Sequence, residues 1–171
     1  IFNFRRTLAL AIKEAGHDVL LISPQGPYVD QLKALGLRWL PVPMARRSLN
    51  PLRELMLIFW LRRLMLQEGT DLIHGFTIKC AVYGALAARL AGVSSRVCGI
   101  DGLGYVFASS ALKALILRPL VRLMLKISLS GRGARLCLQN ADDVELFHRY
   151  KLVDDKHVRL IRGAGVDCNR F

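Results

Sequence analysis

The chain has 171 residues, of which 53% are hydrophobic, so it can bury a full core as one domain and is not a disordered protein. Its formal net charge of +12 favours a phosphate-bearing partner: nucleic acid, an anionic lipid or a phosphorylated substrate. No run approaches the ~18 apolar residues of a spanning helix, and aromatic residues do not interleave with arginine as on surfaces that bind nucleic acid. High hydrophobicity combined with high basicity therefore indicates a membrane surface rather than DNA.

Helices and strands are expected to alternate along the chain. Apolar residues at helical spacing from Phe4 to Ala15 predict a first helix, which Gly16 ends. Later helices are expected at 28–36, 50–69, 77–92, 111–130 and 141–151. Short apolar runs predict strands at 17–23, 37–43, 70–75, 95–100, 134–140 and 157–163. This alternation predicts an α/β fold, a doubly wound parallel sheet of the Rossmann-like kind, with strands buried on both faces.

Local signals mark where three of these helices start, stop or bend. Asn50 and Pro51 suit the N-cap and the first position of one helix. Asn140 is a natural cap for another. Pro119 is expected to break or kink the helix that contains it, because proline has no backbone amide to donate.

Ligands of doubly wound sheets bind at the carboxyl ends of the strands, so polar and glycine-rich segments that follow strands are the candidate sites. Asp101 follows the strand 95–100, where a carboxylate can act as a general base, orient a sugar hydroxyl or simply cap its own turn. The glycines beside it let the backbone approach a ligand, and the aromatic residues beyond can wall a cleft or pack in the core. The loop residues expected at the cleft are Gly102, Leu103, Gly104, Tyr105 and Phe107.

A second candidate segment joins the strand 70–75 to the next helix. His74 lies at the end of the strand, and Thr77 begins the helix. Lys79, near the helix N-terminus, can hold a phosphate with help from backbone amides. The alternative is a structural histidine beside a solvated lysine.

Two helices combine apolar surface with basic residues. Arg118, Arg122 and Lys126 are four apart and therefore share one helix face. Such surfaces suit an anionic bilayer, because long basic side chains reach the head groups while apolar ones enter the membrane. The residues expected on this membrane face are Trp60, Arg62, Arg63, Arg118, Arg122 and Lys126. The alternative is a pair of ordinary core helices with solvated arginines.

The four cysteines do not indicate a metal site. Cys80, Cys98, Cys137 and Cys168 form no CxxC pair, and no histidine lies at ligand spacing from them. We expect reduced thiols and no bound metal.

Five segments, taken in order, resemble a known family: RRTLALAIKEAGHDVLLISPQG, DLIHGFTIKCAVYGALAARLAG, GLGYVF, LCLQNADDVELF and LIRGAGVDCNRF. They resemble the N-terminal, acceptor-side domain of glycosyltransferase family 4 enzymes with the GT-B fold, in the branch that builds bacterial lipopolysaccharide O-antigen chains and capsules. The resemblance implies that residues 1–162 are this acceptor-side half. Residues 163–171, with Gly163, Gly165 and Asp167, would start the linker to a C-terminal donor-binding domain.

The resemblance also implies an activity and a location. It implies transfer of a sugar, with retention, from a UDP-sugar to an undecaprenyl-diphosphate-linked saccharide at the inner face of the bacterial plasma membrane. It implies no metal and no cofactor. Asp101 stands where many relatives carry His or Thr before GLG, which makes it the catalytic candidate. The chain starts at Ile1 and ends at Phe171, so we expect a fragment that lacks its first strand and donor domain and is inactive alone.

Two other functions remain open from the sequence. One is a UDP-sugar epimerase of the same fold, which would not need basic apolar helices. The other is a non-catalytic module that docks on membranes and recruits a donor subunit. Binding of nucleic acid is supported by charge alone.

Overall fold

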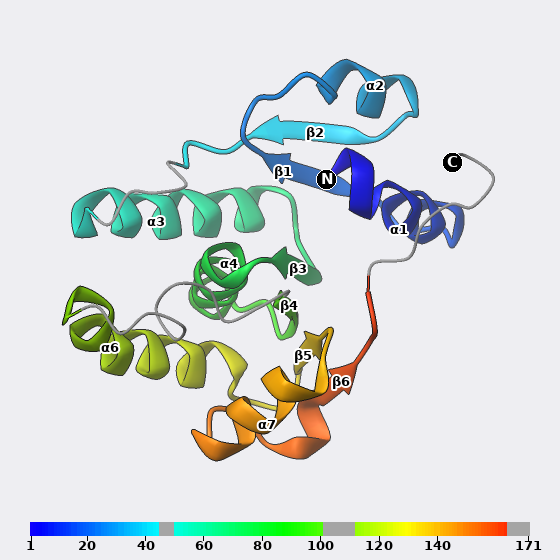
Figure 1. Cartoon of the computed structure of the whole chain (residues 1–171). Helices are drawn as coiled ribbons and strands as arrows, with labels where there is room; N and C mark the ends of the chain where they lie inside the picture. Colours follow the sequence, from blue (N-terminus) through cyan, green and yellow to red (C-terminus); the bar gives the residue numbers. More distant parts are fainter. Residues whose placement is uncertain (45–49, 101–111, 164–171) are drawn as a thin grey trace. The chain divides into compact units, whose positions relative to one another are not determined.

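A computed structural model of the chain describes residues 1–44, 50–100 and 112–163 (Figure 1). The chain divides into two compact units. One contains residues 1–48 and 163–171, and the other contains residues 49–162. The candidate residues that the structure describes lie almost entirely in the second unit, and each unit is considered by itself below.

The first unit contains a small parallel sheet. Its elements are α1 (Phe2–Glu14), β1 (Leu20–Ser23), α2 (Val29–Ala34) and β2 (Arg38–Pro41). The two strands pair with Leu21 opposite Trp39. Phe2 and Ala9 of α1 pack with Leu32 of α2 in the core of this unit.

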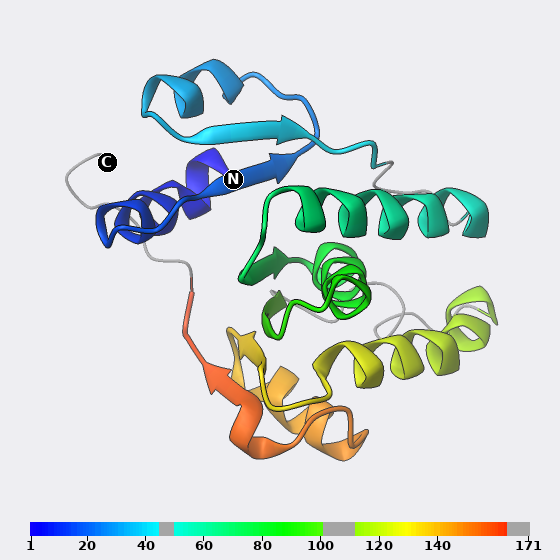
Figure 2. The ribbon, with the colours of Figure 1, turned by 180° about the vertical axis from the view of Figure 1, so that it is seen from behind.

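The second unit is a run of alternating helices and strands (Figures 1 and 2). Its elements are α3 (Pro51–Gln67), β3 (Leu72–Phe76), α4 (Ile78–Ala91), β4 (Ser95–Ile100), α6 (Leu112–Leu129), β5 (Ala134–Leu138), α7 (Ala141–Arg149), a 3-10 turn (Asp155–His157) and β6 (Val158–Leu160). The four strands form one sheet in the order β3-β4-β5-β6, and every neighbouring pair is parallel. The predicted α/β fold with parallel strands is therefore confirmed.

Local sequence explains where the helices begin and end. The Asn50 side chain accepts hydrogen bonds from the backbone amides of Leu52 (3.0 Å) and Arg53 (3.4 Å), and Pro51 follows at the first helical position, as predicted. Asn140 caps α7 by accepting from the amide of Asp143 at 2.7 Å. Gly92 ends α4 in the left-handed conformation that glycine adopts without strain.

Three helices share one core with the middle strands of this sheet. Cys98 and Ile100 of β4 lie opposite Leu136 and Leu138 of β5, so their side chains point to the same face. All four are fully buried there. The helix residues that pack on them are Ala81, Val82 and Ala85 of α4, Leu125 and Leu129 of α6, and Phe147 of α7. Side chains at the alternating positions point to the other face, away from these helices.

The sequence predicted that Pro119 would break or kink its helix, and the helix does not break there. Pro119 lies inside α6, which continues through it. Proline removes the amide that would bond the carbonyl of Leu115, and Leu125 and Leu129 anchor the rest of the helix in the core. Tertiary packing therefore outweighs the local helix-breaking tendency. The strand Ser95–Ile100 has the predicted bounds, and β3 starts two residues later and ends one residue later than predicted. The other four strands are shorter than predicted, because their apolar runs include residues of the adjoining turns.

Candidate functional site

The candidate site is the carboxyl edge of β3 and β4. β4 ends at Ile100, and the predicted loop residues Asp101, Gly102, Leu103, Gly104, Tyr105 and Phe107 lie outside the described residues. What the structure describes at this edge is the end of β3, its turn into α4 and the last residues of β4. These segments contain the predicted residues His74, Thr77 and Lys79.

His74 and Phe76 form an aromatic pair on the sheet face opposite α4. They alternate with Gly75, which faces the helix, and their ring centroids are 4.1 Å apart. Gly99 of the neighbouring strand leaves room for this pair. A Cβ atom there would lie 3.0 Å from Phe76 Cδ1 and 3.5 Å from His74 Nε2. Gly99, which lies just before Asp101 in sequence, therefore makes room for the aromatic pair.

Thr77 holds a backbone conformation that is almost restricted to glycine. Its φ of 69° and ψ of 155° put an exposed, β-branched residue in a strained region. Strain of this kind costs about 1–3 kcal/mol and persists only where the surroundings enforce it. The Thr77 amide donates to the carbonyl of Gly99 at 3.0 Å, and its own carbonyl accepts from the amide of Ala81 at 2.9 Å. Strain at an exposed turn beside strand ends supports a ligand-binding role.

Gly75 sets the distance between β3 and α4. A Cβ atom there would lie 2.7 Å from the Ala81 Cα and 2.8 Å from the carbonyl oxygen of Cys80, both of which belong to backbone. Only glycine fits this gap, and the N-terminal half of α4 is therefore held close to the strand end.

Lys79 makes an ion pair instead of facing solvent. Its Nζ lies 2.8 Å from Glu54 Oε1, and the two side chains are 20% and 12% exposed. The same ammonium lies 5.7 Å from the centre of the Tyr83 ring, one turn further along α4. Glu54 belongs to the first turn of α3, so this cluster joins the beginnings of two helices.

Tyr83 is the third member of this cluster. Burial, the negative charge of Glu54 and a hydrogen bond to Glu54, in that order, raise the pKa of Tyr83 to about 12. The hydroxyl therefore stays protonated at neutral pH. Only Lys79 of the three was singled out from the sequence. One sequence feature could have pointed to Glu54: it is the one acidic residue in the segment 51–67, which is otherwise mostly basic or apolar.

Some of the residues predicted to face a membrane make contacts within the protein instead. Arg62 Nε donates to the carbonyl of Leu90 at 3.0 Å, and the Arg122 guanidinium lies 3.8 Å from the centre of the Tyr150 ring. Trp60 and Arg118 are half-buried. Arg63 and Lys126 are exposed.

Exposed apolar side chains form a stripe on each of these two helices. On α6 the stripe follows helical spacing through Ile116 (66% exposed), Leu120 (53%) and Leu123 (56%) to Ile127. The exposed apolar residues of α3 are Leu52, Leu55, Met56, Phe59 and Leu66. Both helices pack against α4, and they start on the same side of it (Figures 1 and 2).

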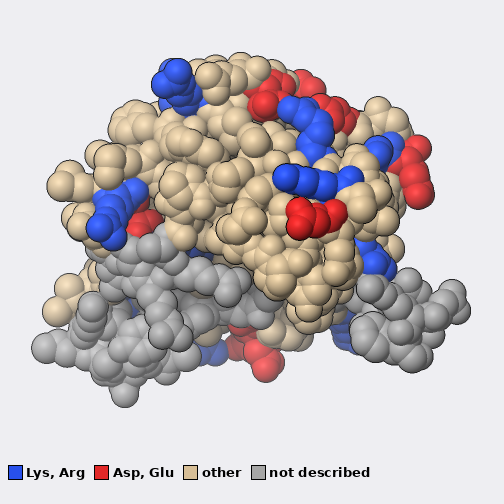
Figure 3. Space-filling model, turned by 90° about the horizontal axis from the view of Figure 1, so that it is seen from above, with Lys and Arg blue, Asp and Glu red and all other residues tan. Residues whose placement is uncertain are grey.

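Charged residues of both signs share one face of the molecule. Figure 3 shows one face of the molecule, on which Lys and Arg lie interspersed with Asp and Glu among uncharged residues. By contrast, the sequence of α6 contains four basic residues and no acidic one. Concentrated positive charge therefore accompanies the apolar stripe of α6.

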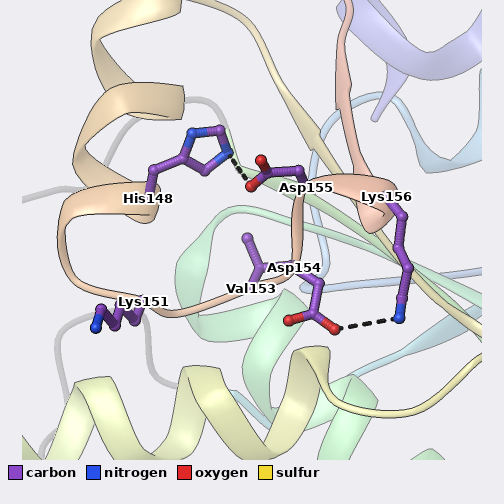
Figure 4. Close-up of a pocket in the computed structure, with 6 residues that line it drawn as sticks. All are labelled: His148, Lys151, Val153, Asp154, Asp155 and Lys156. Carbon is purple, nitrogen blue, oxygen red and sulfur yellow. Dashed lines mark ion pairs between the residues drawn. The ribbon is translucent and has the colours of Figure 1, made fainter.

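An open hollow of about 570 Å³ lies between the end of α7 and the start of β6, the last strand of the sheet (Figure 4). Four of the side chains that line it pair with each other: His148 with Asp155 at 3.0 Å, and Asp154 with Lys156 at 3.4 Å. Parallel α/β sheets bind ligands at the carboxyl ends of their strands, and this hollow precedes a strand. It is therefore not the candidate site.

Cysteines and metals add nothing to the site within the described residues. Cys80, Cys98 and Cys137 are reduced cysteines, and burial raises the pKa of Cys98 to about 12. No group of three or more His, Cys, Asp or Glu side chains in the described ranges could hold a metal ion. No helix in those ranges is both long enough and apolar enough to cross a bilayer.

The predicted linker residues Gly165 and Asp167, and also Cys168, lie outside the described residues. Gly163 has a φ of +80°.

Comparison with known proteins gives the family context. The family model described as "Glycosyl transferase 4-like domain" matches residues 4–163. The chain is 27% identical, over its whole length, to N,N'-diacetylbacillosaminyl-diphospho-undecaprenol alpha-1,3-N-acetylgalactosaminyltransferase of Campylobacter jejuni, of which it covers 45%. It is 30% identical over 153 residues, 89% of the chain, to UDP-Gal:alpha-D-GlcNAc-diphosphoundecaprenol alpha-1,3-galactosyltransferase of Escherichia coli, of which it covers 38%.

A solved structure agrees with this context at the level of fold. The chain superposes on a glycosyltransferase from Rickettsia africae with a TM-score of 0.64 at 19% sequence identity. The match covers 96% of this chain and 40% of that one. The chain therefore spans less than half the length of each of these three proteins.

Proposed function

The chain belongs to the family of glycosyl transferase 4-like domains, and from that premise we propose that it is the acceptor-side half of an enzyme that glycosylates an undecaprenyl-diphosphate-linked saccharide. The observation that carries the proposal is the family match over residues 4–163. The names of both curated relatives contain a diphospho-undecaprenol acceptor, which supports the same acceptor class for this chain.

The proposed donor is a UDP-sugar, and the proposed stereochemical course is retention. One relative's name gives UDP-Gal as donor, and both names specify alpha-1,3 transfer. An α-linked UDP-sugar that yields an α-linked product reacts with retention. The acceptor hydroxyl oxygen bonds to the anomeric carbon while the bond from that carbon to the UDP phosphate oxygen breaks. UDP leaves with the electron pair and takes up the hydroxyl proton. We propose that no metal or other cofactor takes part, as the family resemblance implies.

The residues that would serve the acceptor lie on the carboxyl edge of β3 and β4. Thr77 presents a hydroxyl from a strained, exposed turn, and the aromatic pair of His74 and Phe76 directly precedes it in the chain. Asp101 comes next in sequence after β4, and we propose that its carboxylate acts on the reacting hydroxyl. The donor would be held mainly by a second domain beyond residue 162.

The membrane would contact the apolar stripes of α3 and α6. Crossover helices run antiparallel to their strands, so α6 starts on the same side of the sheet as the ends of β3 and β4. The stripe residues Ile116 and Leu120 lie in the first half of α6, near that side. A lipid-linked saccharide anchored beneath these helices would reach the candidate site. This arrangement supports a peripheral location at the inner face of the plasma membrane.

The experiment uses the full-length polypeptide encoded by the reading frame that contains this chain. It is incubated with bacterial membranes and a panel of radiolabelled UDP-sugars, and the lipid-linked fraction is extracted. Label in that fraction with one donor supports the transferase, and a large loss in Asp101→Asn assigns that carboxylate to the chemistry. Interconverted UDP-sugars without lipid label would indicate an epimerase. Vesicle binding without any transfer would indicate a docking module.

A further inference from the structure

The ion pair of Lys79 changes what this residue can do at the site. Its ammonium lies 2.8 Å from the Glu54 carboxylate, and both side chains are mostly buried. A buried, paired lysine is a poor partner for a mobile phosphate, because the phosphate would have to displace Glu54 and leave that carboxylate uncompensated. The contact instead fixes the second residue of α4 to the first turn of α3.

We infer that Glu54, Lys79 and Tyr83 form a positioning cluster that holds the Thr77 turn in its acceptor-binding conformation. The inference rests on the proposed function for the identity of the acceptor. The three residues are not catalytic residues, because they act through the turn and not on the reacting atoms.

The geometry connects the cluster to the turn in two short steps. Lys79 is two residues after Thr77, and the pair with Glu54 fixes the start of α4 from one side. From the other side, Gly75 allows the strand end to lie against Ala81. Between these two contacts, Thr77 is held with its amide on the carbonyl of Gly99. A strained turn needs enforcement of this kind on both sides.

Tyr83 makes the cluster more than a single ion pair. It packs against the buried cluster that Ile58 of α3 forms with Ala87 and Ala88 of α4, and its hydroxyl hydrogen-bonds Glu54. The Glu54 carboxylate therefore has two partners on α4, one turn apart. This fixes the direction of α4 relative to α3 as well as the distance between them.

The test compares Glu54→Gln, Lys79→Met and the double variant in the full-length enzyme. Val93→Ala is the matched control, because Val93 is buried in the same α3–α4 cluster, beyond the C-terminus of α4. We expect Glu54→Gln to raise the acceptor KM about tenfold while kcat and the donor KM stay within about twofold. The double variant is expected to be no worse than the more affected single variant, because the two residues act as one unit.

Hydrogen exchange gives a second readout that does not depend on activity. The amides of Thr77 and Ala81 are expected to exchange about tenfold faster in Glu54→Gln than in Val93→Ala. Equal exchange at these amides, or a Glu54→Gln enzyme whose acceptor KM matches that of the control, would overturn the inference. A wild-type enzyme that labels no lipid with any donor would overturn the proposed function instead, and hydrogen exchange would still decide whether the cluster holds the turn.

Discussion

The backbone amide of Thr77 donates a hydrogen bond of 3.0 Å to the carbonyl oxygen of Gly99. This bond ties the turn after β3 to the last residues of β4, directly before the segment that contains Asp101. The turn after β3 and the last residues of β4 therefore lie together at one edge of the sheet. The predictions below follow from how that edge is held.

Thr77→Gly is expected to stabilise the fold. The substitution relieves a backbone conformation that suits glycine, and the flexibility that glycine adds to the unfolded chain offsets part of the gain. We expect the free energy of unfolding, measured with urea, to rise by about 1 kcal/mol. Thr7→Gly is the control, because Thr7 is exposed within α1, where glycine is the poorer helix former. A loss of stability in Thr77→Gly would show that the turn is not strained.

Two glycines on either side of the β3–α4 contact should respond to alanine in opposite ways. Gly75→Ala puts a methyl group against the Ala81 backbone and is expected to destabilise by about 1–3 kcal/mol. Gly84→Ala meets only Ile73 Cδ1 at 3.7 Å, inside α4, and is expected to stabilise by about 0.5–1 kcal/mol. Thermal unfolding of the two variants checks this pair. Equal shifts in Tm would contradict the packing account.

Tyr83 should titrate late in an alkaline titration. It ionises near pH 10 when exposed and at about 12 in the fold, so the folded protein keeps a proton that the unfolded chain loses. The stability that comes from this group is therefore complete below pH 10 and is lost as pH rises through 12. The tyrosinate absorbance of the wild type minus that of Tyr83→Phe isolates the ionisation of Tyr83. Glu54→Gln should lower its midpoint but not restore it to 10, because burial is the larger cause. A difference transition centred near pH 10 in the wild type would be inconsistent with the cluster.

The apolar stripe of α6 should govern binding to anionic vesicles. Ile116→Gln combined with Leu120→Gln removes two exposed side chains from the stripe, and we expect vesicle partitioning to fall about tenfold or more. Leu160→Gln is the control, since Leu160 is also exposed but lies on β6. Higher salt should weaken the binding further, because the basic residues of α6 lie beside the stripe. If the control loses as much binding as the double variant, the stripe is not the contact.

Patterns within a few residues of each other predicted most of the fold. Asn50 with Pro51, and Asn140 before α7, act through neighbouring backbone groups, so the sequence alone located these helix starts well. The apolar runs located the strands, since burial against helices leaves continuous hydrophobic sequence. Pro119 does not break its helix, because the packing that carries α6 past it comes from distant elements.

Contacts between distant residues could not be predicted in the same way. Glu54 and Lys79 are 25 positions apart, and nothing local to either residue reveals the other. The sequence suggested a phosphate-binding role for Lys79 because it lies near a helix start, which is a local property. The paired role follows only when α3 packs on α4 and the buried Glu54 carboxylate meets the ammonium. The strain at Thr77 was also beyond prediction, because threonine normally avoids that conformation.

The most direct test of the central claim is transfer to a defined acceptor. The full-length polypeptide would be incubated with each radiolabelled UDP-sugar and with purified undecaprenyl-diphosphate-linked N-acetylhexosamine in detergent. We predict label in the lipid-extractable product with one donor, and none when the acceptor is left out. If no UDP-sugar labels this acceptor or the lipid-linked saccharides of bacterial membranes, the assignment of the chain to lipid-linked glycosyl transfer is wrong.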